Sequence, residues 1–138
     1  SDFGSARSLG FTTEVGKTYL AIVCGEPGTI TSFTAAKSDS NASINSNRVD
    51  IVTSQSTAGA FGKQFVATAA TTYIWLQNAN NGAGTTGYYD GVYVFEVDPT
   101  DTTERTIDID DWDGTDLYDI LPHANVISVN QYAPGDRP

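Results

Sequence analysis

The chain has 138 residues, the size of one ordinary domain, and carries seven basic against 17 acidic side chains, for a net charge of −10. This balance argues against nucleic acid as a partner, because neutralising phosphates requires clustered cations, and it also disfavours anionic membranes. It is compatible with divalent cations or with docking on a basic partner. No apolar run approaches the roughly 18 residues that span a bilayer.

Short segments rich in Val, Ile, Phe and Tyr alternate with connections rich in Thr, Ser, Asn and Gly. This composition is typical of many short strands joined by turns. No long segment has a 3.6-residue apolar period, so we expect little helix. The predicted strands are Lys17–Gly25, Thr29–Ala36, Arg48–Thr53, Gly62–Thr68, Thr71–Asn78 and Tyr88–Val97, with a weaker candidate at Ser8–Thr13.

Period-two alternation in several of these segments predicts one all-β domain over residues 1–97, an antiparallel sandwich. Cys24 is the only cysteine, so an internal disulfide is impossible, and its place in an apolar strand predicts a buried thiol. The residues that we expect in or near the core are Tyr19, Ile22, Ile51, Phe65, Ile74, Leu76, Val92 and Val94.

Two strands carry aromatic residues on one face. In Thr71–Asn78, alternation separates Ile74 and Leu76 from a row made of Tyr73, Trp75 and Gln77.

In the strand Tyr88–Val97, Val92 and Val94 share one face and Tyr93 and Phe95 share the other. We favour burial of these two aromatics, because large rings usually supply core volume. If the valines face the core instead, the aromatics form an outer patch.

Residues 98–138 differ in composition, beginning with a linker-like Asp98–Asp101 and ending with an apolar run at Val126–Val129. This segment is too short for a robust core of its own, so we expect an extended C-terminal arm that packs on the sandwich or on a neighbouring subunit. Its apolar side chains would otherwise form a larger exposed surface than soluble monomers normally carry.

The chemical motifs fail when tested individually. Gly16-Lys17-Thr18 lacks the glycine five residues upstream that a phosphate loop needs, and a strand follows it. The acidic stretch Asp108–Asp116 does not place acids at EF-hand positions 1 and 12, which leaves a solvated acidic turn or some other calcium site. His123 is the only histidine, and no nucleophile-elbow pattern accompanies it. We expect no enzymatic activity.

Four segments together resemble a known family. Val15–Ala21, Phe65–Thr68, Thr72–Asn78 and Gly87–Val92 are similar, in that order, to carbohydrate-binding-module-like (galactose-binding-like) jelly-roll domains. The resemblance covers about Phe11 to Val97 and implies a jelly-roll β-sandwich. It also implies that Asp90 matches the family's aspartate that helps to hold a structural Ca²⁺, so that no cofactor other than this metal is expected.

Domains of this kind occur as glycan-binding appendages and in phage structural proteins, and fold alone does not choose between these roles. We favour a non-catalytic structural or assembly module of a virion, such as a capsid-decorating, tail or fibre protein. It would work as a homo-oligomer or with other virion proteins, and would be located in the virion or outside the cell. The alternative is a glycan-binding module of an extracellular or cell-surface protein. Sugar rings would stack on Tyr73, Trp75 and Tyr93, and the amide of Gln77 would hydrogen-bond the sugar hydroxyls.

Overall fold

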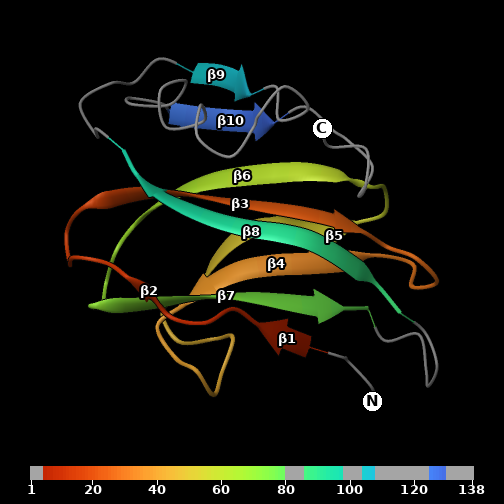
Figure 1. The fold of residues 1–138 in the computed structure, drawn as a ribbon, viewed down its shortest axis with the longest axis horizontal. Coiled ribbons are helices and arrows are strands. Elements are labelled where there is room, and N and C mark those ends of the chain that lie inside the picture. Colours follow the sequence, from red (N-terminus) through yellow and green to blue (C-terminus); the bar gives the residue numbers. More distant parts are fainter. Residues whose placement is uncertain (1–4, 80–85, 98–103, 108–124, 130–138) are drawn as a thin grey trace.

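The protein is an antiparallel β-sandwich of two sheets, which confirms the all-β prediction (Figure 1). The computed structural model describes residues 5–79, 86–97, 104–107 and 125–129. The described residues contain no helix that could span a bilayer.

The first sheet has five strands in the order β1-β7-β4-β5, and β2 also pairs with β7. The second sheet has three strands in the order β6-β3-β8. The strands of the first sheet are β1 (Ser5–Arg7), β2 (Phe11–Thr12), β4 (Phe33–Ser38), β5 (Val49–Gln55) and β7 (Thr71–Asn78). Those of the second sheet are β3 (Thr18–Glu26), β6 (Gly59–Val66) and β8 (Tyr88–Glu96).

Five predicted strands lie within a few residues of their observed bounds, and Thr71–Asn78 coincides with β7. The predicted Thr29–Ala36 starts too early, because a turn occupies its first residues. Gly28 has a φ of 61°, and the Ile30 N–H donates to the carbonyl of Pro27 at 3.0 Å. The chain therefore enters β4 only at Phe33.

The core lies between the two sheets. Tyr19, Ile51, Phe65, Ile74 and Leu76 are buried in one cluster, as predicted, and Val92 and Val94 pack against it. The predicted core residue Ile22 is also fully buried, but alternation along β3 places it on the opposite face of the second sheet.

The preferred burial of Tyr93 and Phe95 in the core is wrong. The valines of β8 face the cluster, so the two aromatics, stacked at 6.5 Å, lie on the outer face of the second sheet. The rings of Tyr19 and Phe65 already fill this part of the core, stacked at 5.8 Å, which leaves room on β8 for the smaller valines.

Strand β3 is buried on both faces. Tyr19, Ala21 and Val23 belong to the core cluster, while Leu20 and Ile22 on the other face have no exposed surface either. Cys24 is buried, as predicted. A sandwich strand normally alternates between a buried and a solvated face, so the outer face of the second sheet is unusual in being apolar.

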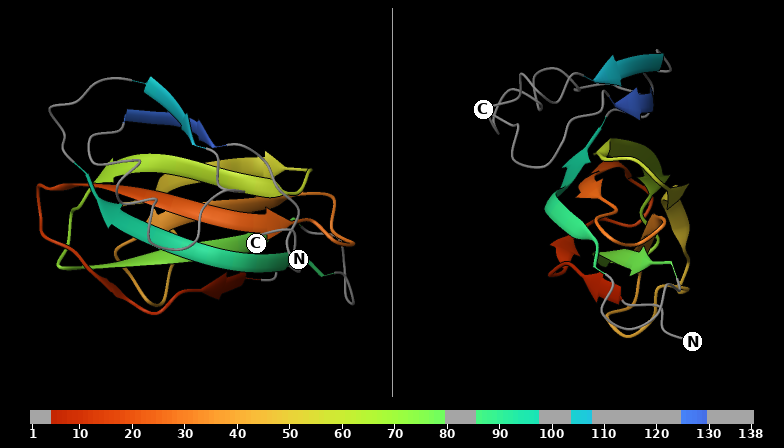
Figure 2. Two further views of the ribbon diagram at one scale, coloured as in Figure 1. Left: turned by 45° about the horizontal axis from the view of Figure 1, so that its top comes forward. Right: turned by 90° about the vertical axis from the view of Figure 1, so that its right-hand side faces the viewer.

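A separate parallel pair of strands, β9 (Glu104–Ile107) and β10 (Asn125–Val129), lies beside the sandwich, with β10 next to β6 (Figure 2). The predicted apolar run Val126–Val129 is thus a strand. The acidic stretch Asp108–Asp116 and His123 lie outside the described residues.

Candidate functional site

The outer face of the first sheet carries the row predicted from β7. Tyr73, Trp75 and Gln77 alternate with the buried Ile74 and Leu76, and each is half-buried. The row is therefore partly accessible and lies on one rigid strand.

Two polar contacts fix the aromatic rings of this row. The guanidinium of Arg7 lies 5.5 Å from the centre of the Tyr73 ring, a cation–π contact. The indole Nε1 of Trp75 donates to the carbonyl of Ser40 at 3.0 Å, and the Arg7 Nε donates to the carbonyl of Asn41 at 2.8 Å. The β4–β5 loop is thus tied to the rim of the row, so that only part of the Trp75 ring could stack on a ligand.

The fourth predicted glycan residue is elsewhere. Tyr93 pairs with Ile22 in the second sheet and lies on its outer face, whereas the row on β7 lies on the outer face of the first sheet. The structure brings Tyr73, Trp75 and Gln77 together and separates Tyr93 from them by the thickness of the sandwich.

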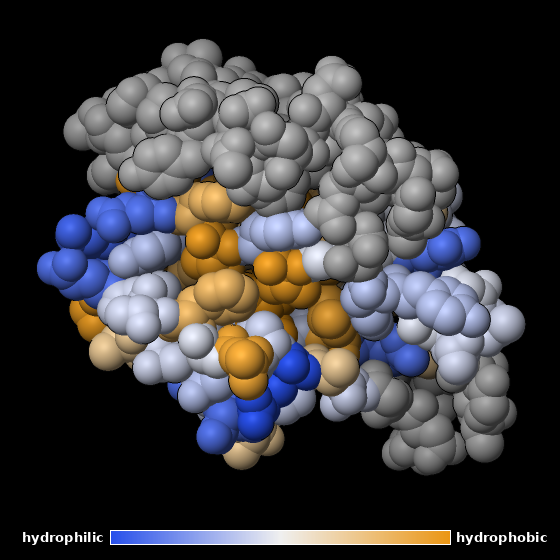
Figure 3. Space-filling model, viewed as in Figure 1, coloured by the Kyte–Doolittle hydropathy of each residue, from blue (hydrophilic) through white to orange (hydrophobic). Residues whose placement is uncertain are grey.

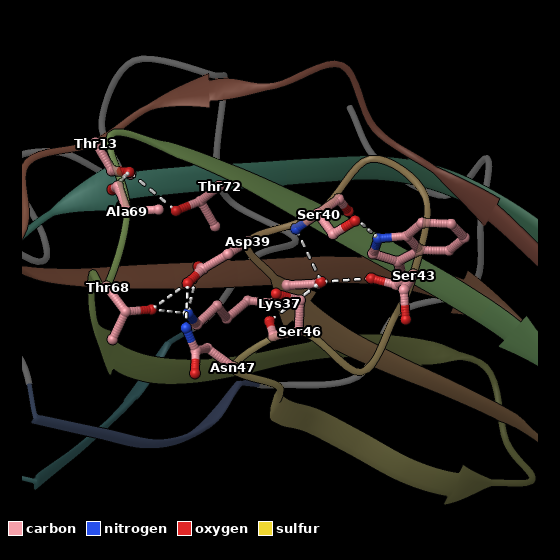
Figure 4. Close-up of polar contacts among 12 residues, drawn as sticks. Thr13, Lys37, Asp39, Ser40, Ser43, Ser46, Asn47, Thr68, Ala69 and Thr72 are labelled. Carbon is pink, nitrogen blue, oxygen red and sulfur yellow. Dashed lines mark hydrogen bonds and ion pairs between the residues drawn. The ribbon is translucent and has the colours of Figure 1, made fainter.

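A buried polar cluster, which was not predicted from the sequence, lies at the end of β4. The Nζ of Lys37 donates to Oδ1 of Asp39 at 2.8 Å and to Oγ1 of Thr68 at 2.7 Å (Figure 4). The other carboxylate oxygen, Oδ2, accepts from Thr68 at 2.7 Å and from Nδ2 of Asn47 at 2.8 Å. Lys37 also lies 5.7 Å from the centre of the Phe65 ring.

This cluster is closed, since its members satisfy one another. Burial alone would raise the pKa of the Asp39 carboxyl, but the hydrogen bonds from Lys37, Asn47 and Thr68 outweigh it and hold the pKa below the ordinary 3.8. A carboxylate held in its charged form by three donors is a poor general base. The cluster therefore acts as a structural ion pair that anchors the β4–β5 loop.

A small pocket of about 260 Å³ opens at the other end of β7, lined by Ser5, Ala6, Leu76, Asn78, Gly87 and Tyr89. The Tyr89 hydroxyl donates to Oδ1 of Asn78 at 3.1 Å, and burial raises the pKa of Tyr89 to about 12. The described residues of the lining carry no charged side chain, which favours a small neutral group over an ion.

The metal prediction concerned Asp90, which lies in β8 at an irregularity of register. Cys24 pairs with Gly91 and Gly25 with Tyr89, so Asp90 is the residue that bulges between these pairs. Among the described residues, no group of three or more His, Cys, Asp or Glu side chains could hold a metal ion. The calcium site remains a prediction.

Comparisons with protein-family models, with curated proteins and with solved structures gave no significant match. The fold class therefore rests on the structure itself.

Proposed function

We propose that the chain is a non-catalytic structural module that assembles with copies of itself or with a larger particle, as a capsid-decorating, tail or fibre protein of a phage virion does. The observation that carries this proposal is the burial of β3 on both faces. A sandwich surrounded by water needs only one apolar face on each sheet, the face that packs on the core. The second sheet, in contrast, is apolar on both of its faces.

The apolar outer face strengthens the proposal energetically. Burying a side chain such as Leu20 or Ile22 contributes about 1.5–3 kcal/mol, so a sheet with this face in water would be markedly less stable. Tyr93 and Phe95, on the same face of edge strand β8, remain half-exposed. We propose that residues 98–138 form an arm that covers this face, within one chain or across to a neighbour.

The topology supports the jelly-roll part of the proposal. From β2 to β8 the chain alternates between the two sheets, except that β4 and β5 form a hairpin in the first sheet. A jelly roll of two four-stranded sheets has this alternation, with one further strand in the second sheet. We also propose that the chain is related to the carbohydrate-binding-module-like jelly-roll domains and that Asp90 helps to hold a structural Ca²⁺.

Light scattering on the full chain over a concentration series, and on a shortened chain ending at Val97, tests the function. We expect the full chain to associate and the shortened chain to lose thermal stability and bind a dye that reports exposed apolar surface. If both are monomers of equal thermal stability, the assembly function is refuted.

Glycan binding is the second candidate, favoured by the half-exposed row Tyr73, Trp75 and Gln77 on one strand. Aromatic rings stack on sugar rings and amides bond their hydroxyls. A glycan array tests it, with Trp75→Ala as the variant and Tyr93→Ala as the control on the other sheet. Specific binding that only Trp75→Ala abolishes would favour this function over assembly, and a blank array would exclude it for the glycans tested.

A further inference from the structure

We infer that the open edge of β8 pairs with β8 of a second copy, joining two second sheets into one continuous antiparallel sheet. The inference rests on the proposed assembly function and names the surface through which it works. Within the described part of the chain, β8 hydrogen-bonds only to β3. A nine-residue strand at the edge of the described sheet is a ready template for pairing with another chain.

The hydrogen-bonding groups on this edge can be assigned. The Val97 N–H donates to the carbonyl of Thr18 at 3.0 Å, so Val97 and Thr18 form a hydrogen-bonded pair. These pairs alternate along an antiparallel ladder, so Phe95 and Tyr93 also direct their backbone groups at β3. The N–H and C=O of Val92 and Val94 therefore point away from β3, towards the open edge.

This side of the sandwich is also apolar. Figure 3 shows hydrophobic residues gathered over β8 and between β8 and β7. Phe11, Val92 and Val94 are partly buried residues that pack against the core without being fully covered by it. A strand added at this edge would extend the sheet over these residues. Natural sandwiches often place charged residues or proline at such an edge to prevent pairing.

The sequence of the edge fits a second copy of itself. An antiparallel register centred on Val94 places Val94 opposite Val94 of the second copy. Tyr93 then faces Phe95 of the second copy, and Phe95 faces its Tyr93. Aromatic pairs directly opposite each other are among the cross-strand contacts that stabilise sheets. The charged side chain nearest to Val94 in this strand is Glu96. Its carboxylate already forms an ion pair with the Lys17 ammonium, with Nζ and Oε1 3.2 Å apart.

Proline at Val94 tests the edge, with alanine as its matched control. Both changes remove the branched side chain that packs on the core, but only Val94→Pro removes the N–H that points outward. Proline is tolerated in edge strands at positions where that N–H faces solvent. We expect the full chain and Val94→Ala to form a dimer that dissociates on dilution, and Val94→Pro to remain a monomer with the thermal stability of Val94→Ala.

Hydrogen exchange supplies a second readout on the unmodified chain. The amides of Val92 and Val94 should gain protection as concentration rises, while the amide of Phe95, bonded to β3, should change little. Since each copy carries a charge of −10, added salt should strengthen the dimer by screening repulsion. Self-association that salt weakens would instead indicate attraction between opposite charges of the two copies and would overturn the inference.

The outcomes separate the two proposals. If the full chain associates and Val94→Pro associates equally well, the β8 edge is not the interface, although assembly stands. If the full chain is a monomer at every concentration and the amides of Val92 and Val94 exchange freely, both self-assembly and the β8 interface are refuted.

Discussion

The Nζ of Lys37 lies 2.8 Å from Oδ1 of Asp39, and both side chains are almost completely buried, at 1% and 9% exposure. Lys37 pairs with Ile74 across β4 and β7, so it points into the sandwich rather than away from it. A charged lysine there is tolerated only because Asp39 and Thr68 supply its hydrogen bonds.

Breaking this pair on one side should destabilise the protein strongly. Asp39→Ala leaves the Lys37 ammonium buried without its counter-charge, and we expect a loss of about 3–5 kcal/mol in the free energy of unfolding. Urea denaturation measures it. The control is Arg48→Ala, which removes the more exposed pair with Asp50 and should cost only about 0.2–1 kcal/mol. Equal effects of the two variants would contradict a structural role for the buried cluster.

The same carboxylate predicts an acid-dependent loss of stability. The pKa of Asp39 is lower in the folded protein than the ordinary 3.8, so its contribution is complete above the unfolded pKa and is lost as the pH falls through the folded pKa. The difference in unfolding free energy between the natural chain and Asp39→Asn should therefore shrink as the pH drops below about 4. A difference that stays constant down to pH 2 would show that Asp39 does not titrate with folding.

Trp75 should hold the β4–β5 loop through its indole. Trp75→Phe keeps an aromatic ring on the outer face but removes the donor to Ser40, which we expect to cost about 1 kcal/mol. Hydrogen exchange of the loop amides should accelerate, while exchange in β3 should change only with global stability. Gln77→Ala, on the same face of β7, is the control that leaves this hydrogen bond intact.

Two glycines with positive φ provide a matched pair. Gly16 has a φ of 90° and no atom within 4 Å of an added Cβ, so Gly16→Ala adds only backbone strain, about 1 kcal/mol. Gly28 has a φ of 61°, and an added Cβ would meet the carbonyl oxygen of Thr86 at 2.5 Å. Gly28→Ala should therefore lower the melting temperature clearly more than Gly16→Ala. Similar melting temperatures would mean that the 86–87 backbone yields easily.

Alternation in the sequence predicted which residues of a strand share a face, but it predicted neither the inward face of β8 nor the neighbours of each strand. Strict alternation in Thr71–Asn78 predicted both the bounds of β7 and the separation of Ile74 from Trp75. It could not tell that Tyr93 lies on the other sheet, because a period of two specifies a face and not a partner strand. That assignment depends on pairing between distant segments.

Lys37 was missed for a different reason. Lysine is almost never buried unless it is paired, so composition assigns it to the surface. Its place in line with Phe33 and Ala35 on alternate positions of β4, followed by Asp39, was the available signal. The resemblance to carbohydrate-binding-module-like domains pointed to Asp90 rather than to this cluster.

The position of β3 also constrains how the chain reaches its native state. Both neighbours of β3 follow it at long sequence separation, since β6 begins at Gly59 and β8 ends at Glu96. During synthesis, Leu20 and Ile22 emerge long before either neighbour exists, and their strand has no local partner to shelter it. Such long-range pairing makes folding slow and leaves an apolar strand exposed to aggregation meanwhile. Overexpression at lower temperature, or together with a chaperone that holds extended apolar segments, should therefore raise the soluble yield.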